Sequence, residues 1–430
     1  MAKQPNILLM ISHDLGTYVG PYGCVPTATP ALNGFAKEGM VFEKHFVSSP
    51  GCSQSRSSLI TGRFPHSNGQ FGLSHLGWTL NRDEQLLPDT LRAAGYHTAM
   101  FGIWHLHEWT LGGFNDLSDD VSTVDSSPEG FANIASKRAG DWLRNYQDEE
   151  PFYLHVGFWE AHRPFCGQPG DPSETPDVDL TDVSLPNYLP DNKATRREFA
   201  HLKHSVESVD AGVDTLLKAL SESGHAEDTI VIFTADHGLP FPRAKGTLYD
   251  PGIQVAFIVR YPGQVREYKR CSALTSNVDV MPTLVELAGA EPPPKVQGKS
   301  LATLLRGESD THATSLFAEK TYHEHYDPIR AIRTERYKFI RNFAERPNLL
   351  MPSDIYNSST RQSMGTDEAF WSHRPEFELY DLEADPSETN NMAMTESELA
   401  NDWSAKLEAW MKETGDPLLR NAIPRPTDQV

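Results

Sequence analysis

The stretch Asn6-Ile-Leu-Leu-Met-Ile-Ser12, followed at once by His13-Asp14, decides the fold. Its apolar residues run on without a break, which is typical of a strand buried on both faces of a parallel sheet. His13, Asp14 and the nearby Gly16 then mark the end of the strand. We therefore expect a central buried strand that delivers polar side chains to one edge of a sheet.

Similar apolar runs and helical patterns alternate along the next 220 residues of the chain, and they support this expectation. Further buried strands are predicted at residues 98–104, 152–158 and 229–234, and helices at 30–37, 87–94, 130–146 and 196–220. Strands that alternate with helices predict an α/β fold with a large, mainly parallel sheet sandwiched by helices.

Polar residues follow each of the four predicted strands. They are His13-Asp14, His105, His162 and Asp236-His237. Ligands of open α/β sheets bind beyond the carboxyl ends of the strands, so one site built from four distant segments is the simplest interpretation. Any single histidine could instead only satisfy a loop, but four such positions together favour a site.

The pattern changes near residue 312. Residues 329–341 alternate like a β-hairpin, and a helix is predicted over 396–413. We expect a catalytic α/β domain over residues 1–312 and a smaller C-terminal α+β domain over 313–430 that contributes substrate contacts. Residues 167–190 are rich in Pro, Asp, Ser and Thr, which predicts a long surface loop.

Composition excludes several classes of protein. The chain has 430 residues and a formal net charge of -21, without a Lys/Arg-rich block, so nucleic acid is not expected as a ligand. No apolar run reaches the roughly 18 residues of a membrane-spanning helix. Four scattered cysteines indicate no disulfide framework. Without a secretory signal we expect a cytoplasmic protein, or a periplasmic or secreted one if a leader was removed.

The segment Gly51-Cys-Ser-Gln-Ser-Arg-Ser-Ser-Leu-Ile-Thr-Gly62 carries the chemistry. A helix N-terminus at Cys52 with Arg56 nearby favours an anion, although a buried structural cysteine would give the same local pattern. The segment resembles the maturation motif of the sulfatase family, Cys-x-Pro-x-Arg followed by Leu-x-Thr-Gly, in which the cysteine is oxidised to formylglycine. Cys52, Arg56 and Thr61-Gly62 match, whereas Gln54 stands in place of the proline.

Other landmarks of the family follow in order over nearly the whole chain. They are Gly102 to His105, Ala161 to Pro164, Thr234 to Gly238, and Lys245 ahead of Leu248 to Gly252. The stretches 239–242, 322–324 and 380–386 look most like the heparan N-sulfatase (sulfamidase) branch. The resemblance implies an alkaline-phosphatase-like fold and hydrolysis of a sulfate ester or sulfamate on a sugar, with N-sulfoglucosamine as a candidate, in glycosaminoglycan degradation.

The resemblance also implies a divalent metal, usually calcium. Its ligands would be His13, Asp14, Asp236, His237 and the formylglycine formed from Cys52. His13 replaces an aspartate of the family, and because imidazole suits Mn²⁺ or Zn²⁺ better, these ions are alternatives to Ca²⁺. A further alternative is that His13 points away and only orients Asp14.

The family mechanism assigns roles to the remaining residues. The hydrated aldehyde attacks sulfur, and Arg56 holds its oxygens. Lys245 matches a sulfate contact, and His162 matches the group that would protonate the leaving atom. His105 matches the base that expels sulfate and restores the aldehyde.

One departure concerns the sulfate contacts. The family's Gly-Lys-x-His segment reads Gly102-Ile-Trp-His105, so a lysine is missing at Ile103. Loss of such a contact costs about 3 kcal/mol, or roughly a hundredfold in rate. Arg163 and Arg243 are the nearest candidates to replace this charge. From the C-terminal domain, His323, Glu324 and Arg330 are expected to contact the sugar.

The expected partners are a sulfated mono- or oligosaccharide substrate and a formylglycine-generating maturation enzyme, with a homodimer suggested by relatives. Two alternatives stay open. A phosphate or phosphonate ester hydrolase could use the same fold and residues. A degenerate binding protein without formylglycine would explain Gln54 and Ile103 together.

Overall fold

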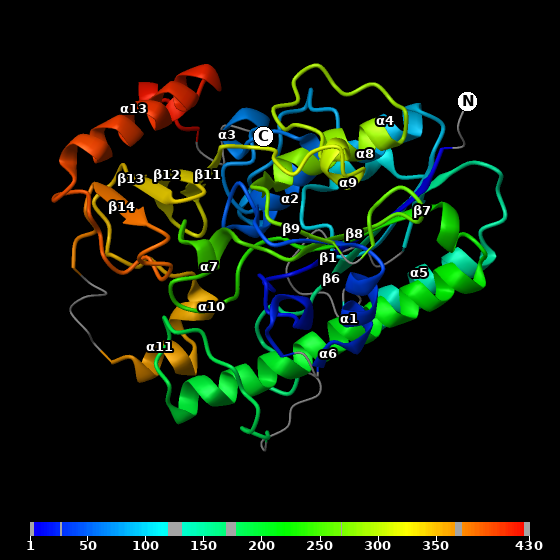
Figure 1. Cartoon of the computed structure of the whole chain (residues 1–430), viewed down its shortest axis with the longest axis horizontal. Coiled ribbons are helices and arrows are strands. Elements are labelled where there is room, and N and C mark those ends of the chain that lie inside the picture. The colour runs from blue at the N-terminus through cyan, green and yellow to red at the C-terminus, as the bar shows by residue number, and fades with distance from the viewer. Residues whose placement is uncertain are drawn as a thin grey trace.

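A computed structural model describes residues 4–25, 28–118, 131–168, 178–267, 269–365 and 372–424. Within these ranges the largest sheet has eight strands in the order β5-β4-β6-β1-β7-β8-β2-β9 (Figure 1). Their bounds are β1 Asn6–Ser12, β2 Met40–Phe42, β4 His97–Gly102, β5 Asp116–Leu117, β6 Phe152–Phe158, β7 Thr229–Ala235, β8 Phe257–Arg260 and β9 Lys269–Cys271. Only β8 runs antiparallel to its neighbours β7 and β2 among these described strands, so the predicted mainly parallel sheet is confirmed.

Strand β1 lies in the middle of this sheet, paired in parallel with β6 and β7. Alternate side chains of a strand point to opposite faces, so its apolar run serves two cores. Ile7, Leu9 and Ile11 pack into one core, and Leu8 and Met10 pack into the other. All five are at most 1% exposed, which explains why the run contains no polar residue.

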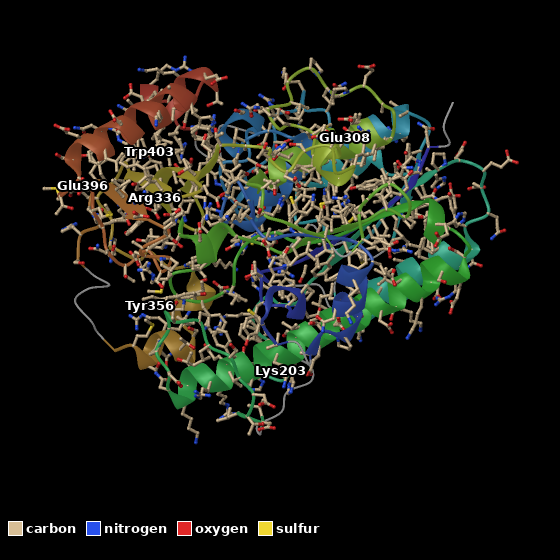
Figure 2. All side chains as sticks on the ribbon, viewed as in Figure 1. Lys203, Glu308, Arg336, Tyr356, Glu396 and Trp403 are labelled. Atoms are coloured by element: carbon tan, nitrogen blue, oxygen red, sulfur yellow. The ribbon has the colours of Figure 1, made fainter. Side chains whose placement is uncertain are left out.

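Helices cover both faces of the sheet (Figure 1). One layer consists of α1 Pro30–Lys37, α5 Ala132–Asn145 and α6 Lys193–Glu222, and the other of α2 Cys52–Thr61, α4 Leu87–Ala93, α8 Val280–Leu287 and α9 Ala302–Leu305. Side chains fill the space between the layers (Figure 2). Smaller elements are α3 Pro65–Asn68, α7 Asp250–Ile253 and the strand pair β3 His45–Phe46 with β10 Thr275–Ser276.

A second, antiparallel sheet follows in the C-terminal part of the chain. It has the order β11-β12-β13-β14, with bounds β11 Ser315–Tyr322, β12 Tyr326–Thr334, β13 Tyr337–Asn342 and β14 Phe377–Asp381. The predicted hairpin is β12 with β13, and the predicted helix is α13 Ser397–Glu413, which packs on this sheet. The sheet begins three residues past the predicted boundary at residue 312. Two short helices, α10 Ser353–Tyr356 and α11 Ser359–Ser363, follow β13.

Most predicted elements agree with the structure to within three residues. The differences are at the ends of elements, such as α6, which begins at Lys193, three residues before its predicted start, because the side chain of Asn192 accepts a hydrogen bond from Thr195 N at 3.0 Å. Gly130 of one predicted helix and residues 169–177 of the predicted loop lie outside the described residues. Residues 178–190 of that loop contain neither helix nor strand. No described helix is long and apolar enough to cross a membrane.

Candidate active site

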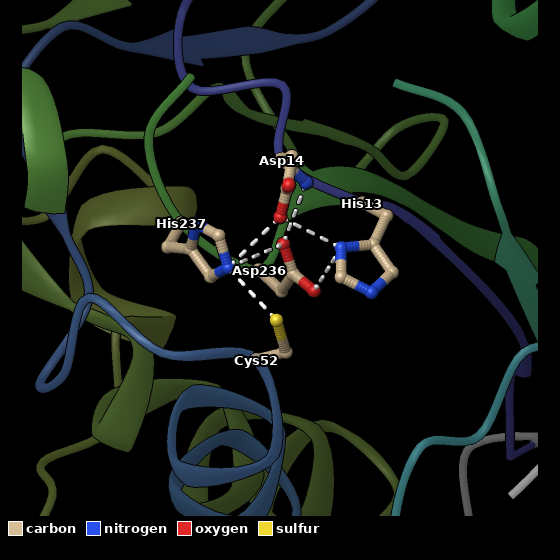
Figure 3. A group of neighbouring side chains, drawn as sticks. All are labelled: His13, Asp14, Cys52, Asp236 and His237. Atoms are coloured by element: carbon tan, nitrogen blue, oxygen red, sulfur yellow. Dashed lines mark hydrogen bonds and ion pairs between the residues drawn. The ribbon is translucent and has the colours of Figure 1, made fainter. Parts of the chain in front are cut away.

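Five side chains from three segments meet at the carboxyl edge of the large sheet (Figure 3). His13 and Asp14 follow β1, Asp236 and His237 follow β7, and Cys52 is the first residue of α2. One ligand atom from each lies within 4.8 Å of all the others, and all five side chains are buried. The structure therefore brings together the five residues that the sequence suggested as metal ligands.

Direct contacts connect these five residues. His13 Nδ1 lies 2.8 Å from Asp14 Oδ1 and 3.3 Å from Asp236 Oδ2, so this ring faces into the cluster. Asp236 Oδ1 accepts a hydrogen bond from Asp14 N at 2.9 Å. His237 Nε2 lies 3.0 Å from Asp14 Oδ1 and 3.1 Å from Cys52 Sγ. The cluster is thus a compact, mutually paired unit.

Helix α2 presents Cys52 at its N-terminus, after the extended cap residue Gly51. Backbone N–H groups at this end of a helix favour a negative charge on the residue that sits there. One turn later, Arg56 Nε donates to Asp236 Oδ2 at 3.0 Å and Nη1 donates to the carbonyl of Ile103 at 3.2 Å. Its Nη2 has no hydrogen-bond partner among the described residues. Arg56 therefore holds the carboxylate of Asp236 in place, and its Nη2 can still donate a hydrogen bond.

Lys245 and His162 lie beside this cluster. The ammonium of Lys245 contacts Asp14 Oδ2 at 2.7 Å, Asp354 Oδ2 at 3.0 Å and His162 Nε2 at 3.2 Å. Because an ammonium can only donate, His162 Nε2 is the acceptor. His162 Nδ1 lies 2.6 Å from the carbonyl of Arg163 and donates to it. These contacts place the proton of the neutral His162 ring on Nδ1.

Neighbouring charges shift the pKa values of Cys52 and His237 in opposite directions. Burial raises the pKa of the Cys52 thiol, but the charges of His13, His237 and Lys245 outweigh burial and hold this pKa well below its ordinary range. Burial lowers the pKa of His237, but the negative charge of Asp236 and other neighbours raises it to about 10. The two shifts favour a thiolate at Cys52 and a protonated imidazole at His237, whose Sγ and Nε2 lie 3.1 Å apart.

A divalent metal fits these five residues. Two carboxylates, two imidazoles and the group at position 52 supply donors within 4.8 Å of one another, in a buried position. Metal ligation requires neutral histidines, so a bound cation would replace the positive charge of His237 as the partner of Asp14 and Asp236. The two imidazoles suit Mn²⁺ or Zn²⁺ better than Ca²⁺, which prefers oxygen ligands, whereas the two carboxylates suit Ca²⁺ and Mn²⁺.

His105 lies on the other side of His13, with the two ring centroids 5.4 Å apart. Its backbone is left-handed, with φ of 59°, and Asp14 also has a positive φ of 50°. This conformation costs about 1–2 kcal/mol for a residue with a side chain, and such residues cluster at functional sites. The fold therefore holds both side chains in place at a local cost.

The structure corrects the expectation that Arg163 contacts substrate or, like Arg243, replaces the missing lysine. Arg163 makes two hydrogen bonds of 2.9 Å to the carboxylate of Glu198. Arg243 donates to the carbonyls of Ser387 and Glu388 at 3.0 and 2.9 Å. Both guanidinium groups are thus used within the fold. Ile103 is uncharged and its side chain is fully buried, so neither this residue nor the two arginines supply the missing positive charge.

Of the three residues predicted to contact the sugar, Arg330 is also corrected. It is fully buried, and its Nε lies 2.6 Å from Asp416 Oδ2 and 3.2 Å from Glu319 Oε2. Glu324 accepts from the backbone of Ser353 at 2.9 Å and so caps α10. His323 follows Tyr322, the last residue of β11, whose carbonyl accepts a hydrogen bond from Gln54 at 2.7 Å, so the end of β11 contacts α2 directly.

Replacing Arg330 with leucine should therefore reduce stability and not catalysis. The change removes the guanidinium partner of two buried carboxylates. Glu319 keeps its contact with His66 and Asp416 keeps the N–H of Leu418, but the lost charge pairing should still lower the free energy of unfolding by about 3–5 kcal/mol. Urea unfolding measures this loss, and activity per folded molecule should stay within about twofold of wild type. The control is Arg336→Leu, which removes a half-exposed guanidinium from its pair with Asp381 and should cost much less than loss of the fully buried Arg330. A large rise in KM at unchanged stability would restore Arg330 to the substrate site.

Two residues near the site were missed at the sequence level. Asp354 contacts Lys245, although 109 residues separate them. The ring of His75 stacks on that of His105, with centroids 5.8 Å apart and an interplanar angle of 4°. Neither lies in a motif. Asp354 follows Pro352-Ser353, which signals only a helix start, so no local pattern could have found it.

Comparisons with known proteins agree with this geometry. A family model described as Sulfatase matches residues 5–290, and one described as N-sulphoglucosamine sulphohydrolase, C-terminal, matches residues 237–356. The chain is 29% identical to human N-sulphoglucosamine sulphohydrolase, over 97% of this chain and 91% of that protein. It is 26% identical to an ulvan-active sulfatase of Formosa agariphila, over 97% and 76% of the two. A putative sulfatase structure from Bacteroides thetaiotaomicron superimposes with a TM-score of 0.76 at 24% identity, covering 99% and 96%.

Proposed function

The chain belongs to the sulfatase family and is therefore a sulfuric ester hydrolase. From this membership we propose that it removes a sulfuryl group from a sugar and that residue 52 provides the nucleophile. The observation that carries this proposal is the convergence of Cys52 with two carboxylates and two histidines within 4.8 Å. We propose that an oxidising maturation enzyme converts Cys52 to formylglycine. We take Ca²⁺ as the first candidate ion, with Mn²⁺ and Zn²⁺ as alternatives favoured by His13.

The groups around Cys52 can stabilise a reacting sulfuryl anion. When bound, the metal supplies Lewis-acid polarisation, and the formylglycine form of residue 52 supplies a hydroxyl nucleophile. Arg56 Nη2 is buried without a hydrogen-bond partner among the described residues, so it can donate to a developing negative charge. The ammonium of Lys245 lies on the Asp14 side of the cluster and supplies a second cation.

His162 is the proposed acid for the leaving atom. At present its Nε2 accepts from Lys245 at 3.2 Å and carries no proton. A sulfuryl oxygen that takes this N–H of Lys245 would free Nε2 to hold a proton of its own, beside the leaving atom. His105, fully buried next to His13, is the proposed base that takes a proton from residue 52 in the second half of the reaction.

We propose a terminal sulfated glucosamine as substrate, with N-sulfoglucosamine first. Two comparisons support this choice, the C-terminal match over residues 237–356 and the similarity to the human enzyme. The net charge of -21 disfavours long polyanionic substrates, because the protein as a whole repels them and only the positive groups of the site attract sulfate. A small pocket that accepts one terminal sugar agrees with this charge.

A panel of sulfated monosaccharides tests the function. Protein coexpressed with a maturation enzyme is assayed for sulfate release from N-sulfoglucosamine, glucosamine 6-sulfate and an aryl sulfate, and for hydrolysis of an aryl phosphonate, with and without chelator. We expect turnover of N-sulfoglucosamine that is lost with chelator and restored by one of the three ions. A clear preference for an aryl phosphonate would favour the ester-hydrolase alternative. An unmodified Cys52 peptide without turnover would favour the binding protein.

Replacing His162 with alanine should reduce activity according to the leaving group. For N-sulfoglucosamine we expect kcat/KM to fall by about 10²–10⁴-fold, the usual contribution of general acid catalysis. An aryl sulfate with an acidic phenol needs little protonation and should lose much less. The control is His97→Ala, because His97 begins β4 and so lies at the end of that strand away from the site. This variant should keep its activity on both substrates. Equal losses on both substrates would contradict the role of His162 as acid.

A further inference from the structure

Asp354 is an acidic residue inside a site that should attract an anion. Its Oδ2 accepts from Lys245 Nζ at 3.0 Å. The side chain of Asp354 is 19% exposed, whereas those of Lys245 and Asp14 are 2% and 0% exposed. Asp354 therefore lies on the solvent side of Lys245, where a substrate would enter. Within the described residues, its side chain makes no other hydrogen bond, so Oδ1 keeps its acceptor capacity.

The carboxylate is held by a firmly anchored element. Helix α10 is capped by Glu324, whose carboxylate accepts from Ser353 N at 2.9 Å and from Ser353 Oγ at 2.7 Å. The next residue, Ile355, is fully buried. The C-terminal part of the chain thus presents Asp354 to the site in a fixed position.

Position within the site limits what Asp354 can contact. Its ligand atom lies within 4.8 Å of those of Asp14 and His162. Because His162 is the proposed acid, Asp354 lies beside the leaving atom. Like charges repel, so a sulfuryl oxygen would not settle against this carboxylate.

The contacts of Lys245 add a second constraint. An ammonium has three N–H donors, and here they point to Asp14, Asp354 and His162. A sulfuryl oxygen that binds Lys245 must displace one of these acceptors. An oxygen that takes the donor now directed at His162 competes for the same ammonium, so the hydrogen bond to Asp354, the only one that this side chain makes among the described residues, weakens as well. A donor on the substrate would compensate for this loss, because a buried carboxylate is costly when left unpaired.

From these contacts we propose that Asp354 is a specificity-determining residue that accepts a hydrogen bond from a hydroxyl or amino group of the sugar, next to the sulfated atom. The inference rests on the proposed function, since it assumes a sulfated sugar in this site. Asp354 then selects sugars over sulfated compounds that lack a neighbouring donor. A hydrogen bond to a charged group is worth roughly a tenfold to hundredfold preference.

A matched pair of ligands tests this role. N-sulfoglucosamine and cyclohexylsulfamate both carry a sulfamate on a six-membered ring, but the second has no hydroxyl groups. Their affinities are measured by calorimetry in a Cys52→Ala background, which prevents turnover, with and without Asp354→Asn. We expect Asp354→Asn to weaken N-sulfoglucosamine at least about tenfold and to leave cyclohexylsulfamate unchanged or slightly tighter. Turnover of N-sulfoglucosamine by the Asp354→Asn enzyme should show the same fall in kcat/KM.

Two results would overturn the inference. An equal loss for both ligands would mean that Asp354 only holds Lys245, and no loss for either would mean that it touches no substrate. Glu324→Gln is the matched control, because it loosens the cap of α10 and leaves the Asp354 carboxylate in the chain, so it should affect both ligands alike. If Cys52→Ala binds both sulfamates but wild type cleaves neither, the proposed function fails while the role of Asp354 is still measured.

Discussion

Replacing Cys52 with alanine should abolish turnover, with kcat reduced by at least about 10⁴-fold. Residue 52 stands at the N-terminus of α2, with its sulfur 3.1 Å from His237 Nε2 and within 4.8 Å of a carboxylate oxygen of both Asp14 and Asp236. Alanine retains the helix but cannot be oxidised to formylglycine, so no hydroxyl nucleophile can form at position 52. Every other group of the cluster is a base, an acid or a cation, and none of them can take over this step.

Sulfate release from N-sulfoglucosamine measures this effect, and mass spectrometry of the tryptic peptide around residue 52 reports its conversion in the wild type. The control is Cys24→Ala, which removes a half-buried thiol outside the cluster and should keep full activity. Thermal unfolding of both variants verifies that they fold. Unchanged rates in Cys52→Ala would show that the nucleophile is wrongly assigned.

Changing Asp14 to asparagine should have the second-largest effect. Asp14 contacts His13, His237 and Lys245 within 3.0 Å, so its charge balances several cations at once. Burial raises the pKa of Asp14, but Lys245 and the neighbouring histidines hold it well below its ordinary value, so the side chain is ionised. Asparagine removes this charge. We therefore expect the variant to lose its bound metal and kcat/KM to fall by about 10³-fold.

Elemental analysis after desalting measures the bound metal, and kinetics with added Ca²⁺, Mn²⁺ or Zn²⁺ measures rescue. The control is Asp89→Asn, which neutralises a half-buried carboxylate on α4 outside the cluster. This control should retain both metal and activity. A full metal content in Asp14→Asn, together with normal turnover, would remove Asp14 from the proposed ligands.

Local sequence patterns predicted the large sheet well because its strands are buried on both faces. A strand such as β1, with Ile7 and Leu9 in one core and Leu8 in the other, must be apolar throughout, and such a run is visible without any partner. Helices packed on the sheet show apolar residues at helical spacing, a pattern that is also visible in the sequence alone. The polar residues directly after these strands were therefore placed at one edge before their contacts were known.

Charged residues that act through distant partners could not be placed in this way. Arg330 was expected at the substrate, but its partner Asp416 lies 86 residues further along the chain and holds it inside the fold. Arg163 was a candidate for the missing cation, but Glu198 pairs with it from 35 residues away. A long charged side chain can pair with any opposite charge that the fold brings near it, and the spacing of residues along the sequence does not reveal which residue that partner is.

By itself, the sequence determined the α/β architecture, the family, and the groups that collect around Cys52. These features depend on local hydrophobic runs and on residues directly at the ends of strands. Only the tertiary structure decided that His13 faces into the cluster, that Arg163 and Arg330 are used within the fold, and that Asp354 reaches Lys245. The physical reason is that ion pairs depend on separations of a few ångströms in space, which the chain creates between residues far apart in sequence.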